Sequence, residues 1–172
     1  MCFTDANPSA FTNHILQGEK NMTGIENFKI IEISTRTANT EGKSEKDLHN
    51  LWGQFLGNHT AEKIPNSTGP EVIALYTDYE SDYTGEYTCI IGLKVSSLET
   101  IPNGMVGREV KGGRFQKYIA KGSMPKAVAE KWINIWDKDH LLNRAYKTDF
   151  EVYGHLSNQG EDSEVQIFLS VN

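Results

Sequence analysis

Hydrophobic positions along the chain repeat with two different periods, and the two periods alternate. Residues 28–37 (FKIIEISTRT) alternate by two, which predicts a strand. Residues 72–79 and 87–95 predict two further strands, the first with a continuous apolar run typical of a strand covered on both faces. Between the first two strands, an apolar stripe at helical spacing predicts a helix that begins near Ser44 and ends at Gly57, with Leu48, Leu51, Trp52, Phe55 and Leu56 in the stripe. Ser44 and Asp47 stand three apart and are expected to cap the start of this helix, as a capping box with Asp in place of Glu.

The second half of the chain repeats this order. Residues 105–110 predict a short strand, and residues 114–121 alternate after a Lys-Gly-Gly turn. Pro125 stands where a helix can begin, because its missing amide proton is not needed in the first turn. The helical stripe then recurs at Val128, Trp132, Ile135 and Trp136, and two strands follow at 149–155 and 164–171. The repeated order indicates an internal structural repeat.

We therefore predict an α+β fold of two pseudo-symmetric strand-helix-strand-strand modules. Antiparallel sheets with a helix on each are expected, with a ligand groove between the modules, because clefts between repeats are common ligand sites. The domain is expected to span residues 28–172, and residues 1–27 to form a poorly structured N-terminal extension. Since Met22 leads directly into the first strand, we hypothesise that it is the biological start of the protein.

Composition narrows the possible partners. The chain has 172 residues, of which 38% are hydrophobic, enough for one domain with its own core. A net charge of -6, with Lys and Arg scattered among acids, argues against a nucleic-acid partner and favours cations. No apolar run approaches the ~20 residues of a membrane helix, and the first residues lack the basic start and long apolar core typical of a secretory signal, so none is expected. With Cys2 and Cys89 as the only thiols, no disulfide framework is predicted, and a cytoplasmic location is expected.

Motifs for metal, phosphate or nucleophilic chemistry are missing from the sequence. The five histidines are dispersed, without metal-ligand spacing between them or beside a cysteine. No glycine-rich phosphate loop and no serine in a nucleophile-elbow context follows a predicted strand. The sequence therefore predicts no metal and no cofactor, and it assigns no catalytic residue unless Glu151 acts as a general base.

Glu151 is the unusual acid of the chain, because it stands between Phe150 and Val152 inside a predicted strand. By alternation Glu151 and Tyr153 share one face of that strand, and the other face, with Phe150, is expected to meet the helix. On the last strand the non-helix face is expected to carry Glu164, Gln166 and Phe168. Glu151, Tyr153, Glu164 and Gln166 are thus predicted to share a groove face.

The residues alone leave two explanations of Glu151 open: a carboxylate on a solvated strand face, or the anionic floor of a ligand pocket. For Trp132 and Trp136, a place in the core competes with a place in the pocket, and Trp132 is the preferred pocket residue. Four tyrosines are candidate pocket walls, and each could equally be an ordinary half-buried strand residue: Tyr76, Tyr83, Tyr87 and Tyr118.

An ordered set of segments resembles the GyrI-like, or AraC effector-binding-like, superfamily, in its integron-associated effector-binding type. The segments are TDYESDYTGEYTCIIGLKV, KGGRFQKYIAKG, WINIW, RAYKTDFEVYG and EVQIFLSVN, and the resemblance runs from about Phe28 to the C-terminus. It implies a two-module α+β fold with a central pocket for organic, often cationic and aromatic, molecules. It also implies a carboxylate at the pocket floor, matching Glu151, and a second acid matching Glu164. The expected ligand-binding residues are Glu151, Tyr153, Glu164, Gln166, Trp132, Tyr118, Tyr87 and Phe168.

The resemblance implies three functions. The leading hypothesis is a stand-alone domain that binds hydrophobic, cationic small molecules in drug sensing or transcriptional regulation. About twenty unpatterned residues stand where many relatives carry a DNA-binding helix-turn-helix, so direct nucleic-acid binding is not expected, and a separate regulator is a candidate partner. The alternatives are a hydrolase of reactive genotoxins that uses Glu151 as general base with Tyr118 or Tyr153, and a gyrase-interacting protein that uses the acidic segment TDYESDYTGEY. The sequence does not set an oligomeric state.

Overall fold

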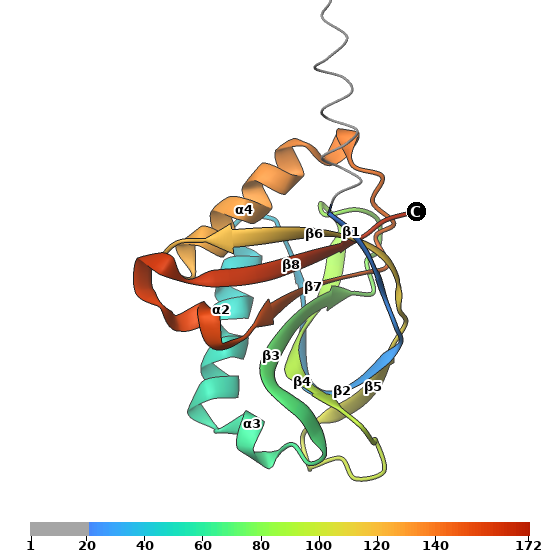
Figure 1. The fold of residues 1–172 in the computed structure, drawn as a ribbon, viewed down its shortest axis with the longest axis vertical. Helices are drawn as coiled ribbons and strands as arrows, with labels where there is room; N and C mark the ends of the chain where they lie inside the picture. The colour runs from blue at the N-terminus through green and yellow to red at the C-terminus, as the bar shows by residue number, and fades with distance from the viewer. Residues whose placement is uncertain (1–20) are drawn as a thin grey trace, which may run out of the picture.

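One curled antiparallel sheet organises the molecule. The computed structural model describes residues 21–172, and its eight strands lie in the order β1-β6-β8-β7-β3-β4-β2-β5 (Figure 1). The strands are β1 Met22–Ile25, β2 Phe28–Ala38, β3 Ser67–Thr77, β4 Glu86–Val95, β5 Val106–Val110, β6 Gly113–Lys121, β7 Thr148–Tyr153 and β8 Glu164–Ser170. The helices are α2 Lys43–Gly57, α3 Thr60–Lys63 and α4 Lys126–Asp137, with 3-10 turns η1 Asp139–Leu141, η2 His155–Asn158 and η3 Gly160–Asp162.

The predicted α+β architecture of two repeated modules is confirmed. The first module contains β2, α2, β3 and β4, and the second contains β6, α4, β7 and β8. The two sheets are joined edge to edge, because β3 pairs with β7 and places Ala74 opposite Glu151. The junction between the modules is therefore itself a strand pair, and Glu151 lies on it.

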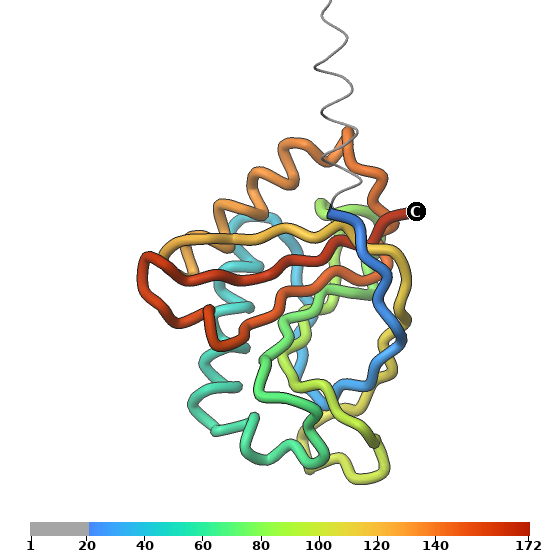
Figure 2. Tube along the Cα trace, viewed as in Figure 1, coloured from blue at the N-terminus to red at the C-terminus, as the bar shows by residue number. Residues whose placement is uncertain are grey.

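A second strand pair joins the modules on the opposite side. Ile25 lies opposite Gly113 and Phe28 lies opposite Val110, so the β1–β6 and β2–β5 pairs follow one unbroken register. At the bend between them, the Gly112 amide donates to Asn27 Oδ1 over 2.8 Å. This continuous ladder links both ends of the strand order and closes the curled sheet into the ring seen in Figure 2.

The ring separates two hydrophobic clusters. On the outer face, α2 and α4 cover a cluster that includes Phe55, Trp132 and Ile167. On the inner face a second cluster contains Ile30, Ile73, Leu75, Ile90, Val110, Phe115, Phe150 and Phe168. Because both faces of β3 are buried, its central residues form the continuous apolar run that the sequence displays.

The predicted helix starts are right to within one or two residues, but the predicted cap of α2 is wrong. Ser44 lies inside the helix, which begins at Lys43. The residue before the helix is Gly42, which has a left-handed φ of 71°. Glycine adopts this conformation without steric cost, so the backbone turns there without a side-chain cap. Asp47 instead accepts from the Lys43 ammonium and the Thr37 hydroxyl.

Part of the expected N-terminal extension belongs to the sheet. Within residues 1–27, Met22–Ile25 form β1 and pair with β6, so that part of the expectation is wrong. A four-residue strand with a central Gly24 carries little local signal, and its partner lies far away in the sequence. Residues 1–20 lie outside the described part of the chain. None of the helices within residues 21–172 is long and apolar enough to cross a membrane.

Candidate functional site

The Glu151 carboxylate lies at the centre of the outer face, where the two modules meet. Its side chain is buried, with the residue only 1% exposed. Oε1 accepts a hydrogen bond from the Tyr76 hydroxyl at 2.9 Å and one from the Trp132 indole nitrogen at 2.5 Å. Oε2 accepts a third from the Tyr153 hydroxyl at 2.7 Å. Three aromatic donors thus hold one carboxylate.

These donors come from different elements. Tyr76 lies on β3, across the module junction, and Tyr153 lies two residues along β7 on the same face as Glu151. Trp132 projects from α4, whose apolar stripe must face the sheet. Trp52, on α2, packs edge-on against Tyr153 with ring centroids 5.0 Å apart. The helices α2 and α4 therefore each contribute an indole: Trp132 contacts the carboxylate, and Trp52 contacts Tyr153 next to it.

Further rings extend this arrangement into an aromatic cluster, defined here as Trp52, Tyr76, Tyr83, Tyr87, Trp132, Trp136 and Tyr153. Tyr76 contacts Tyr87 at 5.9 Å and Trp132 at 5.5 Å, both edge-on. The ring centroid of Trp136 lies 6.1 Å from that of Trp132, and Trp136 is also stacked with Tyr83. The cluster covers Glu151 from the helix side and continues to the loop that joins β3 and β4.

Burial dominates the electrostatics of Glu151. Loss of water raises the pKa of this carboxyl above its ordinary value, and the three donors only partly offset that rise. No Lys, Arg or His side chain within residues 21–172 forms a salt bridge with it. Burial, followed by the nearby carboxylate, also raises the pKa of the Tyr76 hydroxyl and the Cys89 thiol. Glu151 is therefore a buried acid without a fixed counter-charge.

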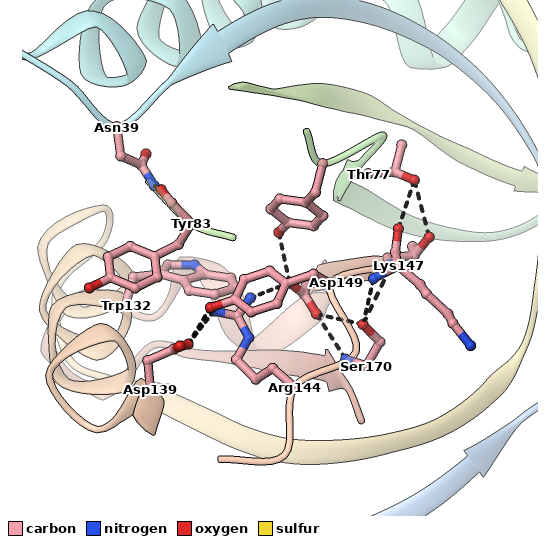
Figure 3. A network of polar contacts seen from close by, with 12 residues as sticks. Asn39, Thr77, Tyr83, Trp132, Asp139, Arg144, Lys147, Asp149 and Ser170 are labelled. Atoms are coloured by element: carbon pink, nitrogen blue, oxygen red, sulfur yellow. Dashed lines mark hydrogen bonds and ion pairs between the residues drawn. The ribbon is translucent and has the colours of Figure 1, made fainter. Parts of the chain in front are cut away.

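A second buried acid on the same face makes an instructive contrast. Asp149 forms a salt bridge with Arg144 at 2.5 Å and accepts from the Tyr79 hydroxyl at 2.7 Å and the Ser170 amide at 2.8 Å (Figure 3). Arg144 also reaches Asp139 at 3.1 Å. Within residues 21–172, Asp149 has a cationic partner, and Glu151, two residues further along β7, has none.

Four of the predicted site residues are brought together. Glu151, Trp132 and Tyr153 are in direct contact, and Tyr87 joins them through the ring of Tyr76. Tyr118 lies on the same outer face in β6, opposite Ile167 and half-buried.

The predicted face of β8 is wrong. Ile167 lies opposite Glu151, so Ile167 shares the outer face while Glu164, Gln166 and Phe168 point to the inner face. Phe168 stacks on Phe150 at 4.8 Å, and Glu164 pairs with Lys121 at 3.1 Å. The expectation that the Phe150 face of β7 meets the helix is also wrong, because Trp132 of α4 contacts Glu151 on the opposite face. Both faces of the sheet carry buried hydrophobic clusters, so a polar residue in a strand does not show which face is exposed to solvent.

Two contributors were not recognised as such from the sequence. Tyr76 was only one of four candidate walls, and its contact with Glu151 depends on the long-range β3–β7 register. Trp52 was placed in the stripe of its helix, and its position beside Tyr153 depends on how that helix crosses the sheet. The pair Arg144–Asp149 had no local signal, because the arginine lies in an irregular segment before β7.

A curled antiparallel sheet of two strand-helix-strand-strand modules, with a buried acid among aromatic rings at their junction, defines a GyrI-like effector-binding domain. A family model described as "Integron-associated effector binding protein" (Cass2) matches residues 22–171. The chain belongs to that family.

Known proteins with similar sequences or folds agree with this membership. The integron cassette protein VCH_CASS2 of Vibrio cholerae is 30% identical, with a TM-score of 0.69 over 88% of this chain and 95% of that one. The Bacillus subtilis (strain 168) protein named "Putative transcriptional regulator protein YobU" is 24% identical over 90% of this chain and 98% of its own length. SAV2435, solved bound to tetraphenylphosphonium, shares the fold with a TM-score of 0.75 at 15% identity, over 88% of this chain and 92% of that one.

Proposed function

We propose that this effector-binding domain binds hydrophobic organic cations, with Glu151 as the counter-charge and the aromatic cluster as the contact surface. The observation that carries the proposal is a carboxylate that is 1% exposed and has no salt bridge within residues 21–172. Such a group is destabilised by lost hydration until a positive charge replaces it. A cationic ligand would supply that charge.

The surrounding rings suit the same class of ligand. A cation over an aromatic face is stabilised by about 0.5–2 kcal/mol for each ring. Trp132 and Tyr153 both contact Glu151 and cover it, so entry of a ligand would require at least one of these side chains to move. SAV2435, which has the same fold, was solved with a lipophilic cation, and this supports the choice of ligand class.

The contacts of Glu151 support binding rather than hydrolysis. A general base needs a free oxygen lone pair directed at a water molecule. Here three aromatic donors occupy three of the about four acceptor positions of the carboxylate, and burial keeps it from solvent. We therefore propose a sensor or sequestering protein that acts in the cytoplasm and passes its signal to a separate regulator, without turnover of the ligand.

Titration with tetraphenylphosphonium tests the proposal. The variant Glu151→Gln keeps the size of the side chain and removes its charge, so its affinity for the cation should fall at least about tenfold, which is about 1.4 kcal/mol. Triphenylphosphine oxide, a neutral analogue, should bind the variant and the wild type alike. Isothermal titration calorimetry gives both affinities.

Glu164→Gln is the matched control, because Glu164 faces the inner side of the sheet. It should bind tetraphenylphosphonium as the wild type does. An equal loss of affinity for the cation and for its neutral analogue in Glu151→Gln would contradict the role of the charge.

A further inference from the structure

The inner face of the sheet holds a cavity of about 640 Å³, on the side of β7 opposite Glu151. Its apolar lining includes Ile73, Phe150, Val152 and Phe168, together with Ile25 and Leu156. Phe150 and Val152 flank Glu151 in the sequence, so alternation directs them inward while the acid points outward. The cavity is therefore separate from the aromatic cluster.

Two lysines reach into this cavity. The Lys94 ammonium lies 4.4 Å from the Phe28 ring centroid and 6.0 Å from that of Phe150. The Lys117 ammonium lies 5.6 Å from the ring centroid of Phe168. Aromatic faces attract these charges but do not neutralise them. The two ammonium groups thus lie beside the stacked pair Phe150–Phe168, whose centroids are 4.8 Å apart.

Neither lysine forms a salt bridge with an acid of the described residues, although two acids line the cavity. Within the described residues, Lys94 and Lys117 have no carboxylate within 4.0 Å. Glu164 also lines the cavity, but it is paired with Lys121 at 3.1 Å. Glu71 lies at the exposed rim. Partial burial lowers the pKa of Lys94, and the charge of Glu71 offsets this only in part.

We propose that this cavity is a second binding site, for amphipathic organic anions. An aromatic or slender apolar body would lie against Phe150 and Phe168, and a carboxylate or sulfonate would pair with the ammonium groups of Lys94 and Lys117. The anion would give these two ammonium groups the salt-bridge partner that neither has within residues 21–172. A volume of about 640 Å³ lies within the ~300–1,000 Å³ range of small-molecule sites.

The two faces of β7 would then select ligands of opposite charge. The outer face presents a carboxylate among tyrosines and tryptophans, and the inner face presents ammonium groups among phenylalanines. The inner site does not depend on the outer one, because no residue of the aromatic cluster lines the cavity.

Titration of the full chain with 2-naphthalenesulfonate tests this site. Lys94→Met and Lys117→Met keep the length of each side chain and remove its charge, and each should weaken binding of the sulfonate at least about fivefold. Lys111→Met removes one positive charge at an exposed turn residue and is the matched control, with affinity unchanged. Added salt should weaken binding to the wild type, because a pair of opposite charges is screened.

Two further measurements separate this site from the outer one. The variant Glu151→Gln should bind the sulfonate as the wild type does, whatever its behaviour toward tetraphenylphosphonium. Intermolecular nuclear Overhauser effects should connect the naphthalene protons to methyl groups of Ile73 and Val152, which both line the cavity.

Three results would overturn the proposal. The first is no measurable binding of the sulfonate to the wild type at millimolar concentration. The second is unchanged affinity in both lysine variants. The third is an equal loss of affinity for the neutral analogue 2-naphthalenemethanol, which would show that the lysines act through packing rather than charge.

Discussion

Asp149 and Glu151 differ by two positions on one strand, yet they are stabilised in different ways. Asp149 has Arg144 as a buried partner, and removing one member of such a pair typically costs about 3–5 kcal/mol. Within residues 21–172, Glu151 has only neutral donors, which occupy three of its about four acceptor positions without cancelling its charge. Its ionised form is consequently a source of instability in the unliganded protein.

This difference predicts a pH-dependent stability. The pKa of Glu151 is raised in the folded state above its unfolded value of about 4.3. The protonated form therefore stabilises the fold at low pH, and this contribution is lost as the pH rises through the folded pKa. Glu151→Gln should therefore show a higher free energy of unfolding than the wild type near pH 7.5, and the difference should become smaller near pH 4.5.

Urea unfolding at the two pH values measures this difference. Glu164→Gln serves as the control, because its carboxylate is partly exposed and its pair with Lys121 contributes little. Equal destabilisation of Glu151→Gln at both pH values would mean that the carboxylate stabilises the unliganded fold.

The loop between β3 and β4 has a structural role that its acidic sequence does not suggest. The Tyr79 hydroxyl donates to Asp149, and the Tyr83 ring stacks on Trp136 at 5.8 Å, with an interplanar angle of 8°. The backbone oxygen of Asp78 accepts from Arg36, and its carboxylate pairs with Arg108. The segment suggested as a gyrase-binding surface thus directs two of its tyrosines inward, Tyr79 onto Asp149 and Tyr83 onto Trp136.

Tyr83→Ala should loosen this loop. Loss of the stack on Trp136 should lower the free energy of unfolding by about 0.5–1.5 kcal/mol. Hydrogen exchange of the amides at residues 79–86 should become faster, while β7 and β8 keep their protection. Tyr83→Phe retains the ring and should exchange as the wild type does. Unchanged exchange in Tyr83→Ala would show that the stack does not hold the loop.

The order of most elements was predictable from the sequence, but β1, α3 and the first residues of β3 were not, and neither were the faces of the strands. The predicted strand 28–37 corresponds to β2 at Phe28–Ala38, and the predicted strand 87–95 to β4 at Glu86–Val95. Alternation assigns residues to two faces but does not say which face a helix covers. The face of β7 that carries Asp149 and Glu151 is buried beneath α4. The assumption that a polar strand face is exposed therefore assigned the helix to the wrong face of β7.

The candidate site was predictable only in part. Alternation placed Glu151 and Tyr153 on one face, but the pocket role of Glu151 came from the family resemblance, since local sequence cannot distinguish a buried strand acid from a solvated one. The Tyr76 and Arg144 contacts depend on register and chain crossing over long sequence distances. Such pairings follow from the whole fold rather than from local preference.

At the scale of the whole molecule, two separate seams hold the modules together. One is the β3–β7 pair, and the other is the continuous ladder in which β1 pairs with β6 and β2 pairs with β5. Without the other module, each module would lose strand pairing at both edges of its sheet. The protein is therefore expected to unfold in a single transition rather than module by module.

Truncation tests the contribution of β1. A chain that begins at Met22 keeps the β1–β6 pair, and a chain that begins at Phe28 behind an added methionine removes it. The shorter chain should lose about 1–3 kcal/mol of unfolding free energy, because paired backbone groups and the Gly112–Asn27 contact are lost. Urea unfolding of both chains gives the difference. Equal stability would show that this part of the ladder does not contribute to the fold.

The closed ladder also bears on how copies of the chain behave when crowded together. Unpaired strand edges act as templates for other chains, and long flat edges promote aggregation. Here the strands at the two ends of the order are the four-residue β1 and the five-residue β5, and each continues through a short bend into the strand on the far side. Within residues 21–172, the unpaired edges at the two ends of the strand order are confined to β1, β5 and the ends of β2 and β6 beyond the ladder, so no long strand is left unpaired along its full length as a template for edge-to-edge polymerisation.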